Sequence, residues 1–169
     1  MISCVMLATW PNRAAMIEDA LLSYDLQDVE DKELVVINDG EPLVSRREDV
    51  RVFNVAAGQS IGAKRNVGLA CARGEWNATW DDDDFSMPTR LSELRRACVE
   101  TGSKYARLAG MLVSDTDWHI GGYMLGSSYP TSIVHRDAAR RVGGYPDLSW
   151  LEDNELYVRL RWRGVPRTK

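Results

Sequence analysis

Short apolar runs alternate with longer amphipathic segments along the first part of the chain. Four of these runs are bounded by polar or turn-forming residues and are too short for buried helices, so each predicts a β-strand. The runs are Ser3–Ala8, Glu33–Ile37, Arg51–Val55 and Trp76–Trp80. How the strands are connected therefore depends on the longer segments between and after them.

Apolar residues in those segments recur at helical spacing and predict three helices. Asn12 is expected to cap the first, the second spans Ile61–Ala72 and ends at Gly74, and the third runs from Pro88 to Thr101. The residues expected to face the core are Met16, Ile17, Ala20, Leu21 and Tyr24, then Val67, Ala70 and Cys71, then Leu91, Leu94, Cys98 and Thr101. This alternation predicts an α/β fold, a single Rossmann-like domain whose mostly parallel central sheet is flanked by helices.

The pattern is less regular in the second part of the chain. Tyr105–Val113 and His119–Leu125 predict strands or a hairpin, and Ser132–His135 predicts a short strand, which together give a small mixed β region. Asp137–Val142 predicts a short helix. A final helix is expected at Glu152–Arg163, with Gly164 as its C-cap. Its inward residues would be Leu156, Tyr157 and Leu160.

Composition narrows the class of protein. The 169 residues suffice for one domain with a substantial core. A net charge of −4 argues against nucleic acid and anionic membranes as partners, and no apolar run reaches the ~20 residues of a transmembrane segment. The start of the chain lacks a basic region and a cleavage site, and Cys4, Cys71 and Cys98 have no metal-ligand spacing. We therefore expect a cytoplasmic protein with free thiols.

Polar residues follow three of the predicted strands, and the most prominent are the four aspartates Asp81–Asp84. Adjacent carboxylates at ~4 Å repel by about 1 kcal/mol in water and about 4 kcal/mol near a protein surface. Such a run needs either open solvent, as in an acidic turn before a helix, or a cation such as Mg²⁺ or Mn²⁺. Thr9 and Asn38-Asp39 follow two other strands. Open α/β sheets bind ligands at this carboxyl edge.

The order of these motifs resembles that of glycosyltransferase family 2, whose members have the GT-A fold. The segments that carry the resemblance are Ala8–Arg13, Val36–Gly40, Ile61–Gly68, Ala72–Trp76, Asp81–Pro88, Val142–Tyr145 and Glu152-Asp153. Each is weak alone, but the ordered set covers nearly the whole chain. The resemblance implies an inverting glycosyltransferase that moves a sugar from a nucleotide diphosphate, with UDP favoured, to an acceptor hydroxyl.

The resemblance also implies how the donor would be bound. Thr9 would lie beside the nucleoside, and Asp39 would accept a hydrogen bond from the base. Lys64 and Arg65 would lie against the nucleotide; the alternative for Arg65 is a cation on the helix surface. These residues all belong to segments that follow or precede predicted strands.

The aspartate run matches the DxD triplet of the family at Asp81-x-Asp83. By resemblance, Asp83 would contact a divalent cation, Mn²⁺ or Mg²⁺. Asp82 would point towards the ribose, and Asp84 would act through water. Four identical residues in a row leave this register ambiguous by one position.

Asp153 resembles the catalytic base of the family. One base and no protein nucleophile predicts inversion at the anomeric carbon. The alternative is that Glu152-Asp153 only caps the helix, where negative charge is favoured. Trp150 would stack on an acceptor sugar or pack as a core or rim residue. His119 and His135 have no ligand partner at useful spacing, so we interpret both as structural.

The alternative from a different class is a non-catalytic GT-A-like module that binds a nucleotide or glycan. Asn38 stands where the family often has an acidic residue, Glu41 stands where serine is common, and many relatives continue beyond the position of Lys169.

We expect a single domain over residues 1–169. Residues 1–103 would bind the nucleotide and residues 104–169 would bind the acceptor. Truncation of the domain at its C-terminus stays open. Acceptor specificity would lie in Asp115–Pro130. The donor sugar, the acceptor and the oligomeric state stay open.

Overall fold

Six β-strands form one sheet in the order β3-β2-β1-β4-β8-β5. The strands are β1 (Ile2–Ala8), β2 (Lys32–Asn38), β3 (Val50–Asn54), β4 (Trp76–Asp81), β5 (Tyr105–Arg107) and β8 (Ser132–His135). The first four pair in parallel, and β8 runs antiparallel to both of its neighbours. This computed structural model describes residues 1–114, 120–125 and 131–166, and it confirms the predicted mostly parallel sheet.

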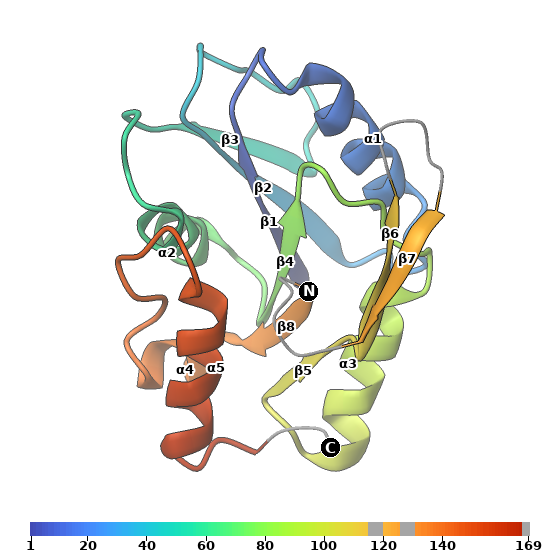
Figure 1. Cartoon of the computed structure of the whole chain (residues 1–169), viewed down its shortest axis with the longest axis vertical. Helices are drawn as coiled ribbons and strands as arrows, with labels where there is room; N and C mark the ends of the chain where they lie inside the picture. Colours follow the sequence, from blue (N-terminus) through green and yellow to red (C-terminus); the bar gives the residue numbers. More distant parts are fainter. Residues whose placement is uncertain (115–119, 126–130, 167–169) are drawn as a thin grey trace.

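Helices cover both faces of the sheet (Figure 1). The helices α1 (Ala14–Asp25) and α3 (Arg90–Thr101) lie on one face. The helices α2 (Ile61–Cys71), α4 (Arg136–Arg141) and α5 (Glu152–Trp162) lie on the other. Across the described ranges, no helix has the length and apolar character needed to cross a membrane.

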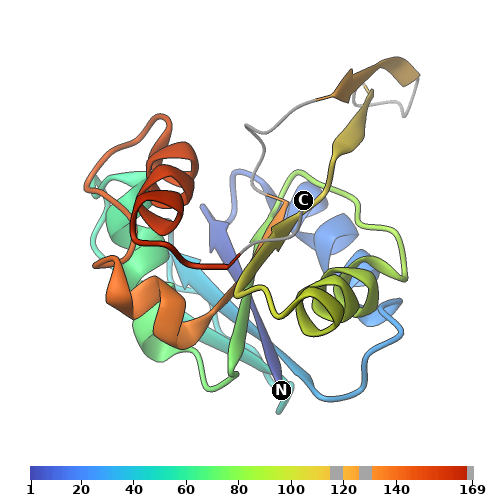
Figure 2. The same cartoon turned by 90° about the horizontal axis from the view of Figure 1, so that it is seen from below.

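A separate antiparallel hairpin consists of β6 (Gly110–Ser114) and β7 (Ile120–Leu125). It projects away from the main sheet, as Figure 2 shows. The strands or hairpin predicted for this region are thus present, but the predicted Tyr105–Val113 strand is divided. Tyr105–Arg107 form β5 at the edge of the main sheet, whereas residues 110–113 belong to β6 of the hairpin.

The core has one apolar cluster on each face of the sheet. Strand alternation sends Ile2, Cys4 and Met6 of β1 towards α1 and α3, where Trp80 is 1% exposed and donates from Nε1 to the carbonyl oxygen of Ala20 at 3.1 Å. The other cluster joins β5 and β8 to α4 and α5. It comprises Tyr105, Val134, Ala138, Ala139, Tyr145, Leu156, Leu160 and Val165.

Several predicted details of α1 and α3 are wrong. Arg13 precedes α1 in place of Asn12, with no side-chain cap, and Met16 is 39% exposed. The helix starts later because the Ala14 N–H bonds to the carbonyl of Pro11 in a turn. The helix α3 begins at Arg90, with Thr89 as its N-cap, two residues later than the predicted start at Pro88. Thr101 is exposed to solvent, and its hydroxyl donates a hydrogen bond to the carbonyl oxygen of Ala97 in the preceding turn.

The inward face predicted for α2 is also wrong. Val67, Ala70 and Cys71 are not buried; the buried residues are Gly62, Arg65 and Gly68. A Cβ at Gly68 would lie 2.2 Å from Val5 Cγ1, and one at Gly62 would lie 1.8 Å from the carbonyl oxygen of Pro146. The face of α2 that carries Gly62 and Gly68 is therefore the buried one, because only glycine allows the helix to come so close to its neighbours. The spacing of apolar residues alone does not reveal this.

Strand register positions the polar residues that follow β1, β2 and β4. Ala8 pairs with Asn38, and Leu7 pairs with Asp81, so these strands end at the same level of the sheet. Thr9, Asp39 and the aspartate run consequently leave the sheet together at its carboxyl edge.

Candidate functional site

Thr9, Asp39 and Lys64 form one cluster at this edge. The Thr9 hydroxyl donates to Asp39 Oδ1 at 2.8 Å, and Lys64 Nζ donates to Asp39 Oδ2 at 2.6 Å. Burial raises the pKa of Asp39, but the hydrogen bonds from Lys64 and Thr9 outweigh it and hold that pKa below its ordinary value. Asp39 is thus an ionised acceptor, and each carboxylate oxygen keeps a lone pair for a further donor.

Asn38 explains how the loops around this cluster are held. Its Oδ1 accepts from the backbone N–H of Trp10 at 3.0 Å, and its Nδ2 donates to Asn54 Oδ1 and the carbonyl of Glu41, both at 2.7 Å. Gly40 lies against the backbone of Trp10, where a Cβ would meet the carbonyl oxygen at 2.0 Å. An amide serves here because the position needs both a donor and an acceptor.

The aspartates of the run point to different partners. Asp81 Oδ1 accepts from Arg65 Nη2 at 3.1 Å. Asp82, with a side chain 4% exposed, pairs with Arg13 Nη1 at 3.0 Å, and Asp83, 52% exposed, pairs with Arg13 Nη2 at 2.6 Å. The repulsion inside the run is therefore offset by two arginines as well as by solvent.

Arg13 is a site residue to which the sequence interpretation assigned no role. Burial lowers its pKa, but the hydrogen bond to Asp83 and the charges of Asp82, Asp83 and Asp81 raise it overall. The sequence did contain one indication of a role for Arg13, because Arg13 follows β1 at the same edge of the sheet where the aspartates follow β4. Sequence spacing alone does not pair two loops so far apart in the chain.

Asp82 and Asp84 are the carboxylates that the fold disfavours most as anions. Burial, together with the neighbouring aspartates, raises the pKa of each to about 6. Arginines oppose this, Arg13 for Asp82 and Arg90 for Asp84. Asp82 is buried and paired with Arg13, so it is less accessible to a ligand than the exposed Asp83.

Arg65 is a buried bridge between two elements, so its interpretation as a helix-surface cation is wrong. Its side chain is 5% exposed, with Nε 3.1 Å from Glu152 Oε1 and Nη2 3.1 Å from Asp81 Oδ1. Glu152 is buried as well. Arg65 thereby connects the end of β4 to the start of α5.

Asp153 is the second residue of α5 and stands next to this bridge. Burial raises the pKa of its carboxyl group above the ordinary value of 3.8. Just before it, Leu151 has a φ of 62°, and Trp150 is 79% exposed, so Trp150 is not a core residue. A half-buried carboxylate with a raised pKa beside an exposed aromatic is suited to accept a proton.

The donor chemistry of the run fits a divalent ion shared with a nucleotide. Within the described residues, no three carboxylate, imidazole or thiol groups converge as a protein-only metal site. Magnesium in nucleotide sites usually takes one or two carboxylates and completes its shell with phosphate oxygens and water. Asp83 offers such an exposed carboxylate, with Asp81 two residues away in the same run.

The remaining predicted residues fall elsewhere. The ring of His135 is structural: Nε2 lies 3.0 Å from Glu75, and Nδ1 accepts from the Asp137 N–H at the start of α4. His119 lies outside the described residues, as do the ends of the Asp115–Pro130 segment. In the middle of that segment, Gly121 and Gly122 belong to β7.

Comparison with known structures shows the same fold in TarS of S. aureus. A TarS chain of residues 1–349 superposes with a TM-score of 0.74 at 19% sequence identity, covering 94% of this chain and 54% of TarS. A longer TarS chain gives a TM-score of 0.75 at 18% identity, with 94% and 33% covered. TarS 1–349 in complex with UDP-GlcNAc gives 0.75 at 19% identity, with 94% and 52% covered. The chain thus spans about half of the TarS 1–349 chains.

Comparison at the level of sequence gives the family. No curated protein matches the chain significantly. The model of the family described as "Glycosyl transferase family 2" matches residues 9–125, more than half of the chain, and this stretch includes Thr9, Asp39, Lys64, Arg65 and the aspartate run. The chain belongs to glycosyltransferase family 2.

Proposed function

We propose that this chain forms the catalytic domain of a metal-dependent, inverting glycosyltransferase that uses a UDP-sugar. One observation carries the proposal: the charged Thr9–Asp39–Lys64 cluster and the solvent-facing Asp83 lie at one edge of the sheet, and Arg65 links this edge to the start of α5, where Asp153 lies. Family membership and the likeness to TarS, which has been crystallised with UDP-GlcNAc and with UDP, support a nucleotide-sugar donor.

The Thr9–Asp39–Lys64 cluster would bind the nucleoside end of the donor. Asp39 is held by two donors and stays ionised, so it can accept the ring N–H of a uracil. Lys64 would remain paired with Asp39 and lie against the nucleotide as a positive charge. The cluster is assembled before any ligand arrives, and this preorganisation lowers the cost of binding.

Asp83 would hold a divalent cation together with oxygens of the diphosphate. When bound, such an ion stabilises negative charge on the leaving group. Arg13, which now pairs with Asp82 and Asp83, would keep the run compensated while the donor is absent. Asp81 pairs with the buried Arg65 and is 18% exposed, whereas Asp83 is 52% exposed, so Asp83 is the more accessible ligand.

Asp153 would remove the proton from the acceptor hydroxyl. Its raised pKa brings its basicity closer to that of a useful general base, a role typically worth 10²–10⁴-fold in rate. A single base without a protein nucleophile gives inversion. The exposed Trp150 would contact the acceptor on the approach to this base.

A thermal-shift panel tests the donor proposal. UDP, GDP and dTDP are added with and without Mn²⁺, and UDP with Mn²⁺ is expected to give the largest rise in Tm. A ligand at about 100 times its Kd stabilises the folded chain by about 2.7 kcal/mol.

Asp39→Asn should abolish the preference for UDP, and Asp83→Ala should abolish the effect of Mn²⁺ on UDP binding. Asp137→Asn, exposed on α4, is the matched control. The absence of any nucleotide shift would contradict the proposal.

A binding module without turnover is the second candidate. It is favoured by the close contact of Arg13 with Asp83, because that ion pair occupies the carboxylate proposed for the metal. Release of UDP from UDP-GlcNAc in the presence of sugar acceptors separates the two functions. Binding of UDP with no turnover of any donor would favour the module.

A further inference from the structure

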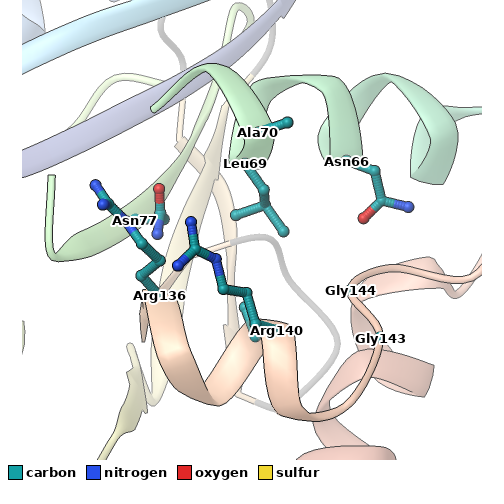
Figure 3. A pocket seen from close by; sticks show the side chains of 9 residues that line it. Asn66, Leu69, Ala70, Asn77, Arg136, Arg140, Gly143 and Gly144 are labelled. Carbon is teal, nitrogen blue, oxygen red and sulfur yellow. The ribbon is translucent and has the colours of Figure 1, made fainter. Parts of the chain in front are cut away.

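A cleft of about 360 Å³ lies between α2 and α4, away from the carboxyl edge. Its walls include Leu69 and Ala70 of α2, Asn77 of β4, and Arg136 and Arg140 of α4 (Figure 3). Asn77 precedes Asp81 by four residues on the same strand, about 13 Å at the rise of a β-strand. The cleft is therefore separate from the proposed donor site.

Asn77 is a buried side chain whose amide has no hydrogen-bond partner among the described residues. It is 3% exposed, and neither Oδ1 nor Nδ2 has a hydrogen bond within the described part of the chain. Buried polar side chains are nearly always paired, because an unpaired one has lost its hydration without replacement. Asn77 is one of the residues that line the cleft, so a partner for its amide would come from that side.

Two arginines on α4 supply positive charge to the same wall. Nη2 of Arg136 donates to the carbonyl oxygens of Gly74 and Ala72, but its Nε is buried without a partner in the described residues. Arg140 lies one helical turn further along, and Figure 3 shows its side chain reaching towards Asn77. The cleft thus presents guanidinium donors beside an amide that can both donate and accept.

The apolar part of the lining restricts the size and shape of a ligand. Leu69 and Ala70 offer carbon surface opposite the arginines. Asn66 also borders the cleft, but its amide is already used by both backbone groups of Tyr145 at 2.8 Å. Asn77 and the two arginines are therefore the groups that would select a ligand.

We propose that this cleft binds a small organic oxyanion, a phosphate or carboxylate that carries a neighbouring hydroxyl group. The anion would pair with Nε of Arg136 and the guanidinium of Arg140, in charge-assisted hydrogen bonds. The hydroxyl would satisfy Asn77, and the carbon skeleton would pack on Leu69 and Ala70. This proposal does not depend on the donor chemistry proposed above.

Calorimetric titration of the full chain with glycerol 3-phosphate, malate and inorganic phosphate tests the proposal, with sodium chloride matching the ionic strength. Glycerol 3-phosphate or malate is expected to bind more tightly than inorganic phosphate. Arg140→Ala should weaken that binding roughly tenfold, which corresponds to one charge-assisted hydrogen bond. Asn77→Leu should have an effect of similar size, while filling the buried volume.

Two control variants make the result specific. Arg141→Ala removes a neighbouring exposed arginine of α4 that does not line the cleft, and Lys64→Ala removes the cation of the donor site. Both should bind the probes as the unaltered chain does. The proposal is overturned if no probe prefers the unaltered chain to Arg140→Ala, or if Lys64→Ala abolishes binding. A crystal structure grown with the probes that shows only water on Asn77 would also overturn it.

Discussion

Glu33 on β2 is a buried carboxylate with three donors. It accepts from the Ser3 hydroxyl and the Arg73 N–H, both at 2.6 Å, and from Arg51 Nη1 at 3.1 Å. Burial raises its pKa, but the bonds from Ser3, Arg73 and Arg51 lower it below the ordinary 4.5. The native state thus binds fewer protons than the unfolded chain near this pH. The stabilisation is present above pH 4.5 and is lost as the pH falls through the folded pKa.

Glu33→Gln is therefore expected to lower the free energy of unfolding by about 2–4 kcal/mol at pH 7, because Arg51 loses its charge partner. The difference between variant and unaltered chain should shrink below pH 4.5. Urea unfolding at several pH values measures it. Glu30→Gln, an exposed neighbour, should be neutral throughout. A difference that stays constant down to pH 3 would show that charge is not the cause.

Asp153→Asn tests the proposed base. The kcat for sugar transfer should fall by 10²–10⁴-fold, while UDP binding and the Tm change little. Because burial raises the pKa of Asp153, the acidic limb of kcat/KM in the unaltered chain should lie at a higher pH than an ordinary aspartate, with its pKa of 3.8, would give. Glu155→Gln, two residues further along α5, is the matched control. Retained transfer in Asp153→Asn would assign the base elsewhere.

At the scale of elements, α2 is the part that organises the site. Its glycines let it approach β1 and the segment before α5, and its Arg65 connects the end of β4 to Glu152. The N–H of Gly62 also donates to the carbonyl of Leu148 at 2.8 Å. The position of Asp153 therefore depends on the packing of α2.

Gly62→Ala should lower the free energy of unfolding by about 1–3 kcal/mol, because the new methyl group overlaps the carbonyl of Pro146 and overpacks the contact. The kcat should fall with it, since the chain leading into α5 is displaced. Differential scanning calorimetry and initial rates check the two effects. Gly122→Ala, which meets no atom of the described chain within 4 Å, should leave the free energy of unfolding unchanged. A more stable Gly62→Ala would contradict the close approach.

At the scale of the whole molecule, the two apolar clusters share one sheet. Neighbouring residues of β8 belong to opposite clusters, Ile133 to the one under α1 and α3 and Val134 to the one under α4 and α5. Strands β5 and β8 also complete the sheet that the first 103 residues begin. Loss of β5 and β8 from the sheet would therefore remove packing from both faces.

The chain is accordingly expected to unfold in a single cooperative transition. Tryptophan fluorescence, to which the buried Trp76 and Trp80 contribute, and far-UV circular dichroism should give the same urea midpoint. The double variant Leu156→Ala/Leu160→Ala, which loosens the second cluster, should shift both midpoints equally. Separate midpoints would mean that residues 1–103 and 104–169 fold as independent units.

Local patterns and motif order predicted the sequence of strands and helices, the mostly parallel sheet, the carboxyl edge with Thr9, Asp39 and the aspartate run, and the resemblance to the family. These features are encoded in local periodicity, in turn residues and in motif order, all of which are read from near neighbours. The individual roles proposed for these residues and for the metal stay predictions until the experiments above are done.

The contacts between distant parts of the chain are known only from its three-dimensional structure. Arg13 pairs with aspartates from another loop, and Arg65 bridges to a glutamate 87 residues away. The glycine face of α2 and the unpaired amide of Asn77 likewise depend on what packs against them. Such contacts arise because folding joins distant segments and because burial decides which charges must be paired, and neither condition leaves a local pattern in the sequence.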